Sequence, residues 1–165
     1  MGMISFLKEA GEKLFGKKPE IAAAAAEPSS QEKLAKANEV AATAIGEYIR
    51  TQGLPADDLT ITFDGASQVV TVAGLVPSQA IKEKIVLCCG NVTGVAGVQD
   101  ELQTVEPADQ SQYHTVVRGD TLSAISKQFY GNANLYPQIF EANKPMLSHP
   151  DKIYPGQVLR IPPQN

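Results

Sequence analysis

The C-terminal part of this 165-residue chain contains the pattern that most restricts how it can fold. Residues 113–117 alternate as a β-strand does, and Gly119 then permits the tight turn that follows. Asp120 or Thr121 can cap a helix whose apolar side chains recur at helical spacing. Those apolar side chains are Leu122, Ile125 and Phe129. A strand, a glycine turn and an amphipathic helix therefore follow one another without a break.

The residues after this helix predict a second helix and a second strand. A helix begins near Asn134 and tolerates Pro137, because the first turn of a helix needs no internal amide donor. Residues 143–145, Asn-Lys-Pro, stop it. Pro155-Gly156 makes a turn, and residues 157–161 form a closing strand. The expected order is strand, helix, helix, strand, with the two strands antiparallel beneath the helices.

Three further segments make this unit similar to a lysin-motif (LysM) domain. They are residues 129–132 (Phe-Tyr-Gly-Asn), 139–143 (Ile-Phe-Glu-Ala-Asn) and 153–162 (Ile-Tyr-Pro-Gly-Gln-Val-Leu-Arg-Ile-Pro). The resemblance implies a βααβ fold and a shallow groove that binds N-acetylglucosamine polymers such as peptidoglycan. The groove residues would be Gly119, Asp120, Thr121, Leu122, Asp151, Ile153 and Tyr154. Two alternatives remain open: the groove is a docking face, or these residues only form the turns of the fold.

The middle of the chain predicts a second small α+β unit. Its expected elements are a helix from a capping box at 29–32 to Gly53, strands at 59–63 and 69–73, a helix from 77 to Gly90 and a strand at 95–105. Residues 72–76 (Val-Ala-Gly-Leu-Val) and 94–102 (Gly-Val-Ala-Gly-Val-Gln-Asp-Glu-Leu) resemble the BON domain family. That resemblance implies a small sheet covered by two helices, so the whole chain is expected to be α+β.

Two breaks in composition divide the chain. Residues 107–112 are polar and turn-prone, which fits a short linker. Residues 19–30 contain an alanine run between prolines and lack apolar periodicity, which indicates a tether or a frayed spacer. The predicted organisation is an N-terminal helix at 1–18 that packs on the BON domain, a linker or insert at 19–30, a BON domain at 31–106, a linker at 107–112 and a LysM domain at 113–163.

The N-terminus and the cysteines both favour a cytoplasmic protein. Charged side chains interrupt what would be the apolar core of an export signal, namely Lys8, Glu9, Glu12 and Lys13. Cys88 and Cys89 are adjacent, so they cannot easily bridge one another, and the chain offers no other cysteine. No later segment is apolar and long enough to predict a membrane span. We therefore expect a cytoplasmic protein without membrane insertion.

No catalytic motif is recognisable in the sequence. His114 and His149 have no cysteine, serine or carboxylate at the spacing of a triad or a metal motif. Cys88-Cys89 is not a Cys-x-x-Cys pair, and small apolar residues at a buried helix end explain it better. The net charge of −4 and the lack of a basic patch with aromatics disfavour nucleic-acid binding. The prediction is a binding protein and not an enzyme.

The order of the parts adds a resemblance that covers nearly the whole chain. A short N-terminal segment, a BON-like unit and a LysM-like unit follow one another, as in small bacterial cytoplasmic potassium-binding proteins of BON–LysM architecture. The similar residues are Met1-Gly2, Phe6, Lys8, 10–14 (Ala-Gly-Glu-Lys-Leu), Gly90-Asn91 and 119–128. The insert at 16–30 departs from that family and leaves the placement of the N-terminal helix open.

This resemblance implies a potassium site made of main-chain oxygens. Potassium is a large cation that proteins hold with neutral carbonyl oxygens, and the last carbonyls of a helix lack internal partners. The family resemblance assigns the carbonyls of Leu7, Ala10, Gly90, Val92, Val95 and Val98 as ligands. Rubidium and caesium are alternative ions. Without the resemblance, residues 90–97 could equally be only a helix stop followed by the entry to a strand.

The implied function is a potassium sensor linked to osmotic or ionic stress. An ion that bridges the N-terminal helix and the glycine-rich loop would order that helix and compact the BON and LysM domains. We expect a monomer with an unidentified protein partner. A membrane-surface helix is the alternative for the N-terminus, because Ile4, Leu7, Leu14 and Phe15 form an apolar stripe flanked by lysines. Binding of peptidoglycan through the LysM domain is the alternative for the whole chain.

Overall fold

The computed structural model describes residues 2–6, 11, 31–106 and 111–163. The first part of the chain contains β1 (Gly2–Ser5), α2 (Gln31–Thr51), β2 (Asp57–Asp64), β3 (Val69–Ser78), α3 (Gln79–Gly90) and β4 (Gly97–Glu106). The second part contains β5 (Gln112–Thr115), α4 (Leu122–Tyr130), η2 (Ala133–Leu135), α5 (Tyr136–Ala142) and β6 (Val158–Ile161). This mixture of helix and sheet confirms the α+β prediction.

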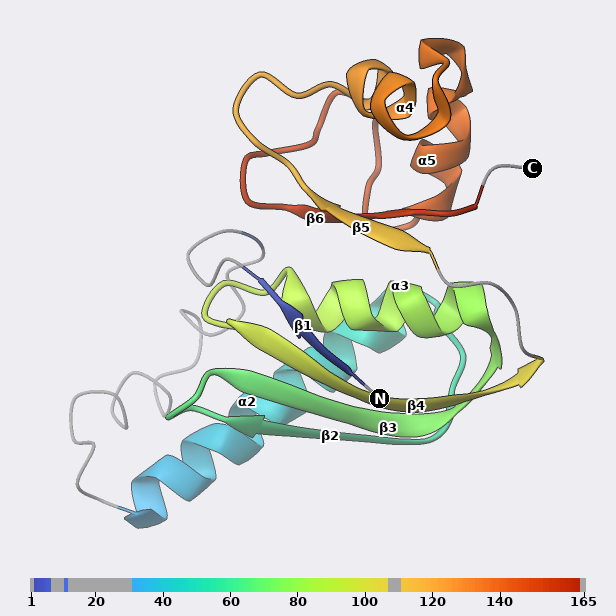
Figure 1. Ribbon diagram of the computed structural model, residues 1–165. Coiled ribbons are helices and arrows are strands. Elements are labelled where there is room, and N and C mark those ends of the chain that lie inside the picture. Colours follow the sequence, from blue (N-terminus) through green and yellow to red (C-terminus); the bar gives the residue numbers. More distant parts are fainter. Residues whose placement is uncertain (1, 7–10, 12–30, 107–110, 164–165) are drawn as a thin grey trace.

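The first part is a four-stranded sheet with the strand order β1-β4-β3-β2 (Figure 1). β3 and β4 are parallel and are joined by α3, whereas β1 and β2 run antiparallel to their neighbours. A parallel pair needs such a crossover, and a helix usually provides it. Apolar side chains on one face of the sheet are buried under α2 and α3: Val70, Val72, Val76, Val98 and Leu102.

Helix α3 lies between the sheet and the second part of the chain (Figure 1). Its N-cap is Ser78, whose Oγ accepts the Ile81 N–H at 3.3 Å. From Ile85 to its end the helix is buried all round, which is expected for a helix covered on two sides. Val158 of β6 is 2% exposed and belongs to the same apolar cluster as the sheet. The two parts of the chain therefore share a core across α3.

The second part has the βααβ order predicted from its sequence. β5 and β6 pair antiparallel, and α4 and α5 pack on them. The Thr121 hydroxyl caps α4 by accepting the Ala124 N–H at 3.1 Å, and Gly131 ends it in the left-handed conformation with φ of 73°. The core between these elements consists of Val116, Leu122, Ile125, Ile139, Leu147, Leu159 and Ile161.

The predicted N-terminal helix at 1–18 is wrong for the residues that the structure describes at the start of the chain. Gly2–Ser5 form strand β1, which pairs antiparallel with β4 so that Ile4 lies opposite Val98. Met3 and Ser5 are exposed whereas Phe6 is buried, which is the two-residue period of a strand. The open edge of β4 decides this conformation, because pairing satisfies main-chain groups that a short helix end would leave unpaired. Residues 7–10 and 12–18 lie outside the described residues.

Candidate functional site

The described candidate ligands lie where α3 ends and the chain enters β4. Gly90 is the last residue of α3, and Asn91 caps it by donating its N–H to the Leu87 carbonyl at 2.9 Å. Gly94, with φ of 101°, lets the loop turn before β4 begins. The four candidates, Gly90, Val92, Val95 and Val98, are all buried. Their main-chain oxygens are therefore screened from bulk water.

The carbonyl oxygens of these four residues differ in what they already bind. Within the described part of the chain, no hydrogen-bond donor reaches the oxygens of Gly90 and Val95. The Val92 oxygen accepts the Val95 N–H at 3.1 Å, which leaves one lone pair. The Val98 oxygen is the least suited to an ion, because Val98 lies in β4, opposite Ile4 of β1.

The direction of the Val98 oxygen follows from its neighbours. The Phe6 N–H donates to the Ala96 oxygen at 2.8 Å, and pairs two residues further along an antiparallel ladder repeat that pattern. The main-chain groups of Val98 consequently face β1, in a hydrogen-bonding position. Gly90, Val92 and Val95 are thus the described oxygens best placed for a cation.

The N-terminal segment meets this loop at two described points. The Phe6 ring lies directly over Gly90, so closely that a Cβ on Gly90 would overlap with the ring. Gly11 lies against the main chain of Asn91, and its own carbonyl accepts the Thr93 hydroxyl at 2.8 Å. Gly11 has φ of +104°, and a Cβ there would overlap with the Asn91 oxygen. The contact of Phe6 with Gly90 and the contact of Gly11 with Asn91 therefore both require glycine.

The two remaining candidates, Leu7 and Ala10, lie outside the described residues. In the sequence they stand between Phe6 and Gly11, the two residues that touch the loop. The loop itself offers main-chain oxygens as donors. In the described ranges, no three His, Cys, Asp or Glu side chains gather in a way that could hold a metal ion.

Asn91 also connects the loop to the second part of the chain, which the sequence interpretation missed. Its side-chain Nδ2 donates to the Val158 carbonyl at 2.9 Å, and its Oδ1 accepts the Val158 N–H at 3.0 Å. These residues are 67 positions apart. The only local signal was an asparagine directly after a glycine that ends a helix, and that signal indicates a cap and not a long-range contact.

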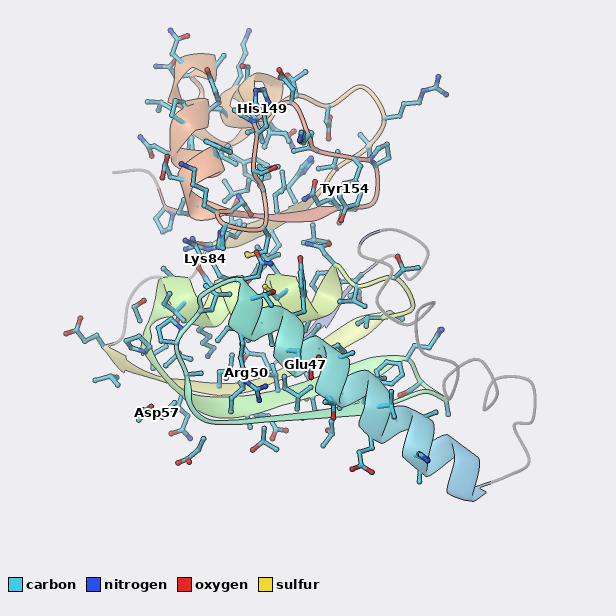
Figure 2. All side chains as sticks on the ribbon, turned by 180° about the vertical axis from the view of Figure 1, so that it is seen from behind. Glu47, Arg50, Asp57, Lys84, His149 and Tyr154 are labelled. Atoms are coloured by element: carbon cyan, nitrogen blue, oxygen red, sulfur yellow. The ribbon has the colours of Figure 1, made fainter. Side chains whose placement is uncertain are left out.

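A buried ion pair between Glu83 of α3 and Arg160 of β6 forms a second connection between the two parts of the chain. The Arg160 Nη2 donates to Glu83 Oε1 at 2.8 Å, and its Nε donates to the same oxygen at 3.0 Å. Ser111 completes the cluster by donating its N–H to Glu83 Oε2 and its hydroxyl to Oε1, each at 2.8 Å. Glu83 and Arg160 are 2% and 6% exposed. Lys84 lies at the same boundary (Figure 2), where burial and then the Arg160 charge lower its pKa.

The ionisation of Glu83 makes acid stability a test of this cluster. Burial alone raises the pKa of Glu83, but the hydrogen bonds from Ser111, Gln79 and Arg160 outweigh it and hold that pKa below 4.5. A lowered folded-state pKa stabilises the protein above the unfolded-state pKa, and this stabilisation is lost as the pH falls through the folded-state value. We expect urea denaturation between pH 7 and pH 3 to show a steeper loss of stability below about pH 4.5 in the wild type than in Glu83→Gln. Equal slopes would contradict this role of Glu83.

The residues assigned to a sugar groove are partly used by the fold itself. Thr121 caps α4, and Leu122 is 3% exposed in the core. Asp120 Oδ2 accepts the Val117 N–H at 3.0 Å and lies 2.8 Å from His114 Nε2; the Val117 and His114 hydrogen bonds lower the pKa of Asp120. The remaining groove residues are Gly119 (φ of 94°), Asp151, Ile153 and Tyr154, of which Tyr154 is visible in Figure 2. Asp151 is exposed, so it is the most accessible of the charged groove residues.

The cysteines fit the structural interpretation. Both Cys88 and Cys89 are buried and unbridged, and burial raises the pKa of the Cys88 thiol to about 12. Such a thiol stays protonated at neutral pH and is a poor nucleophile.

Among the helices that the structure describes, none combines the length and the apolar character that crossing a bilayer requires.

Comparison with known proteins assigns both parts of the chain to domain families. Residues 37–106 match the BON domain family, and residues 114–162 match the LysM domain family. The chain is 50% identical over 163 residues to "Potassium binding protein Kbp" of Escherichia coli O6:H1, and the match covers 98% of this chain and 99% of that protein. That relative is named for ion binding and not for an enzymatic activity.

Other relatives match only in part. An esterase of Mycobacterium tuberculosis is 52% identical over 48 residues, which are 29% of this chain and 10% of the esterase. An uncharacterized protein of Deinococcus radiodurans is 35% identical over 75 residues, 44% of this chain and 29% of that protein. The full-length match and the two domain matches confirm the resemblance stated from the sequence. The chain belongs to the Kbp family, in which a BON domain precedes a LysM domain.

Proposed function

We propose that this protein binds potassium between its N-terminal segment and the loop at 90–98. The observation that carries the proposal is the meeting of these two segments through Phe6 and Gly11, beside the Gly90 and Val95 oxygens that no described donor reaches. The 50% identity to a protein named for potassium binding supports the same ion. The proposed ligands are the carbonyls of Leu7, Ala10, Gly90, Val92 and Val95; the Val98 carbonyl, which faces β1, is the weakest of the six that the family resemblance assigns.

The physical chemistry of the loop favours a monovalent cation. Carbonyl oxygens are neutral dipoles, and a ring of them can replace the weakly held water of potassium without a large cost in mutual repulsion. The C-terminal end of α3 adds the negative end of a helix dipole at Gly90. Burial of the loop strengthens both interactions, because the surrounding dielectric constant is low. Rubidium and caesium have the same charge and a similar preference, so we propose that they bind too.

The proposed role is that of a cytoplasmic sensor. An ion held by both segments stabilises the bound form by mass action, and it therefore orders the N-terminal segment on the BON domain. The LysM domain shares a core with the BON domain across α3, so ordering of the loop compacts the two domains. We propose domain limits of 31–106 and 113–163, joined by 107–112, and a link to osmotic or ionic stress. A protein partner would recognise the compact form of the monomer.

A cation titration tests this function. Thermal unfolding and amide NMR spectra are recorded with potassium, rubidium, caesium and sodium chlorides at constant ionic strength. Potassium at about 100 times its Kd is expected to raise the free energy of unfolding by about 2.7 kcal/mol, with saturable NMR shifts at residues 90–98. Sodium serves as the control and is expected to produce no saturable shift. Equal responses to sodium and potassium, or shifts remote from the loop, would contradict the proposal.

Peptidoglycan binding is the second candidate function, favoured by the match of residues 114–162 to the LysM family. Its most accessible polar contact would come from Asp151, which is exposed. A pull-down with insoluble peptidoglycan separates the two candidates. Retention that is lost in Asp151→Ala, without any potassium response, would replace the sensor by a wall-binding protein.

A further inference from the structure

We propose that the Asn91 side chain transmits potassium binding from the loop to the LysM domain. The inference rests on the proposed potassium site and adds the residue that links that site to domain packing. Asn91 is the described residue at which three parts of the protein meet: the end of α3, Gly11 of the N-terminal segment, and Val158 of β6. It is not itself a proposed ligand.

The main chain of Asn91 is tied to the proposed ligands by covalent geometry. The Gly90 carbonyl and the Asn91 nitrogen belong to one planar peptide unit, so an ion that orients this carbonyl also orients the Asn91 backbone. On its other side, the Asn91 carbonyl lies against Gly11. The position of the Asn91 Cα, and with it the direction of the side chain, is therefore fixed when both ligand segments are in place.

The side chain of Asn91 acts on a strand edge that needs a partner. The Val116 N–H donates to the Gln157 oxygen at 2.8 Å, so the alternation of the ladder points the main-chain groups of Leu159 toward β5 and those of Val158 and Arg160 away from it. Val158 is only 2% exposed, and an unpaired buried amide or carbonyl is costly. The Asn91 amide satisfies both groups of Val158, as a neighbouring strand would.

Asn143 performs the same task one step further along β6 and provides an internal comparison. Its Oδ1 accepts the Arg160 N–H at 2.9 Å, and its Nδ2 donates to the Arg160 oxygen at 3.0 Å. Asn143 follows α5 and belongs to the LysM domain itself, whereas Asn91 comes from the BON domain. Two asparagines therefore pair with the free edge of β6: Asn143 from the LysM domain itself and Asn91 from the ion loop. Only the Asn91 contact can change with the conformation of the loop.

The two contacts on α3 then have different roles. Glu83 and Asn91 are about 12 Å apart along the helix, from eight residues at 1.5 Å each. The Glu83–Arg160 pair involves no proposed ligand, so it holds the domains together with or without an ion. The Asn91–Val158 contact depends on the loop, so ion release loosens the docking of β6 at this end. Because coupling is reciprocal, loss of the contact must also weaken potassium binding.

The test compares full-length wild type, Asn91→Ala, Asn91→Ser and Asn143→Ala. Potassium affinity is measured by calorimetry, and compaction is measured as the radius of gyration by small-angle scattering with and without potassium. We expect Asn91→Ala to bind potassium roughly five-fold or more weakly and to lose the potassium-dependent compaction, with Asn91→Ser falling between it and the wild type. Asn143→Ala removes the corresponding pair of hydrogen bonds to Arg160, together with one to the Ile139 oxygen at 2.7 Å, and is expected to keep the wild-type affinity.

The outcomes separate the inference from the function on which it rests. If the wild type shows no saturable potassium binding, the proposed function and the coupling both fail. If the wild type binds and compacts but both Asn91 variants keep the same affinity and compaction, only the coupling is overturned. A matching loss of affinity in Asn143→Ala would also overturn it, because the effect would then reflect a weakened LysM fold. Asn91→Ser controls for a global folding defect, because serine is a more conservative replacement than alanine. Circular dichroism verifies that this variant is folded.

Discussion

Replacing Gly90 by alanine is expected to lower the free energy of unfolding by about 3 kcal/mol and to abolish the potassium response. A Cβ on Gly90 would overlap with three carbons of the Phe6 ring. Phe6 is 8% exposed and its N–H is bonded to Ala96, so the ring cannot move without leaving the core. The methyl group therefore either strains the end of α3 or displaces the N-terminal segment from the loop, and the potassium site needs both in place.

Gly46→Ala is the matched control for this substitution. Gly46 is also a buried helical glycine, but a Cβ there would lie 3.5 Å from Ile61 Cδ1, which is an ordinary contact. Removing a glycine from the middle of a helix stabilises it by up to about 1 kcal/mol. Urea denaturation of both variants, followed by potassium titration, checks the pair. Wild-type stability in Gly90→Ala would show that Phe6 does not occupy the position over Gly90.

Local signals were sufficient to predict the LysM domain. The cap at Thr121, the apolar spacing of Leu122 and Ile125 and the stop at Gly131 all lie within a few residues of one another, and each determines the helix largely by itself. The hairpin between residues 57 and 78 was predictable for the same reason, because alternation and a short turn specify it. Such segments agree at every level from propensity to packing.

The N-terminal segment could not be predicted in the same way. Ile4, Leu7 and Leu14 have a helical spacing, and lysines flank them, so the amphipathic pattern favoured a helix. The structure instead uses Gly2–Ser5 as an edge strand, because β4 presents an open edge that lies almost a hundred residues away in the sequence. No local pattern reveals an available edge. The conformation of a short segment is set by the partner that completes its hydrogen bonds.

The contacts between the domains were equally hidden in the sequence. Asn91 and Val158 are 67 residues apart, and Glu83 and Arg160 are 77 residues apart. A glutamate that has lysines beside it on a helix is normally expected on the solvated surface. Glu83 is instead buried, because a second domain covers α3. The family resemblance was needed to propose the loop at 90–98 as a site, and the residues that connect this loop to β6 became visible only in the fold.

Removing the charge of Glu83 is expected to cost about 3–5 kcal/mol, the largest effect of a single side chain on the domain interface. In Glu83→Gln the Arg160 guanidinium keeps its charge at 6% exposure but loses the carboxylate that accepts two of its hydrogen bonds. Ser111, which donates twice to Glu83, loses its charged acceptor as well. An uncompensated buried charge is much more costly than the pair is favourable. Urea denaturation and the radius of gyration measure the loss of stability and the separation of the domains.

Glu141→Gln is the control, because the Glu141–Lys144 pair has the same 2.8 Å separation with side chains that are 66% and 44% exposed. Water screens that pair, so its loss is expected to cost no more than about 0.5 kcal/mol. The double variant Glu83→Leu with Arg160→Met removes both buried charges at once and is expected to be more stable than Glu83→Gln. If the two single variants at Glu83 and Glu141 cost the same, the pair at Glu83 is open to water and cannot be the permanent contact between the domains. If instead the double variant is stable but no longer compact, the pair specifies how the domains dock and contributes little to their stability.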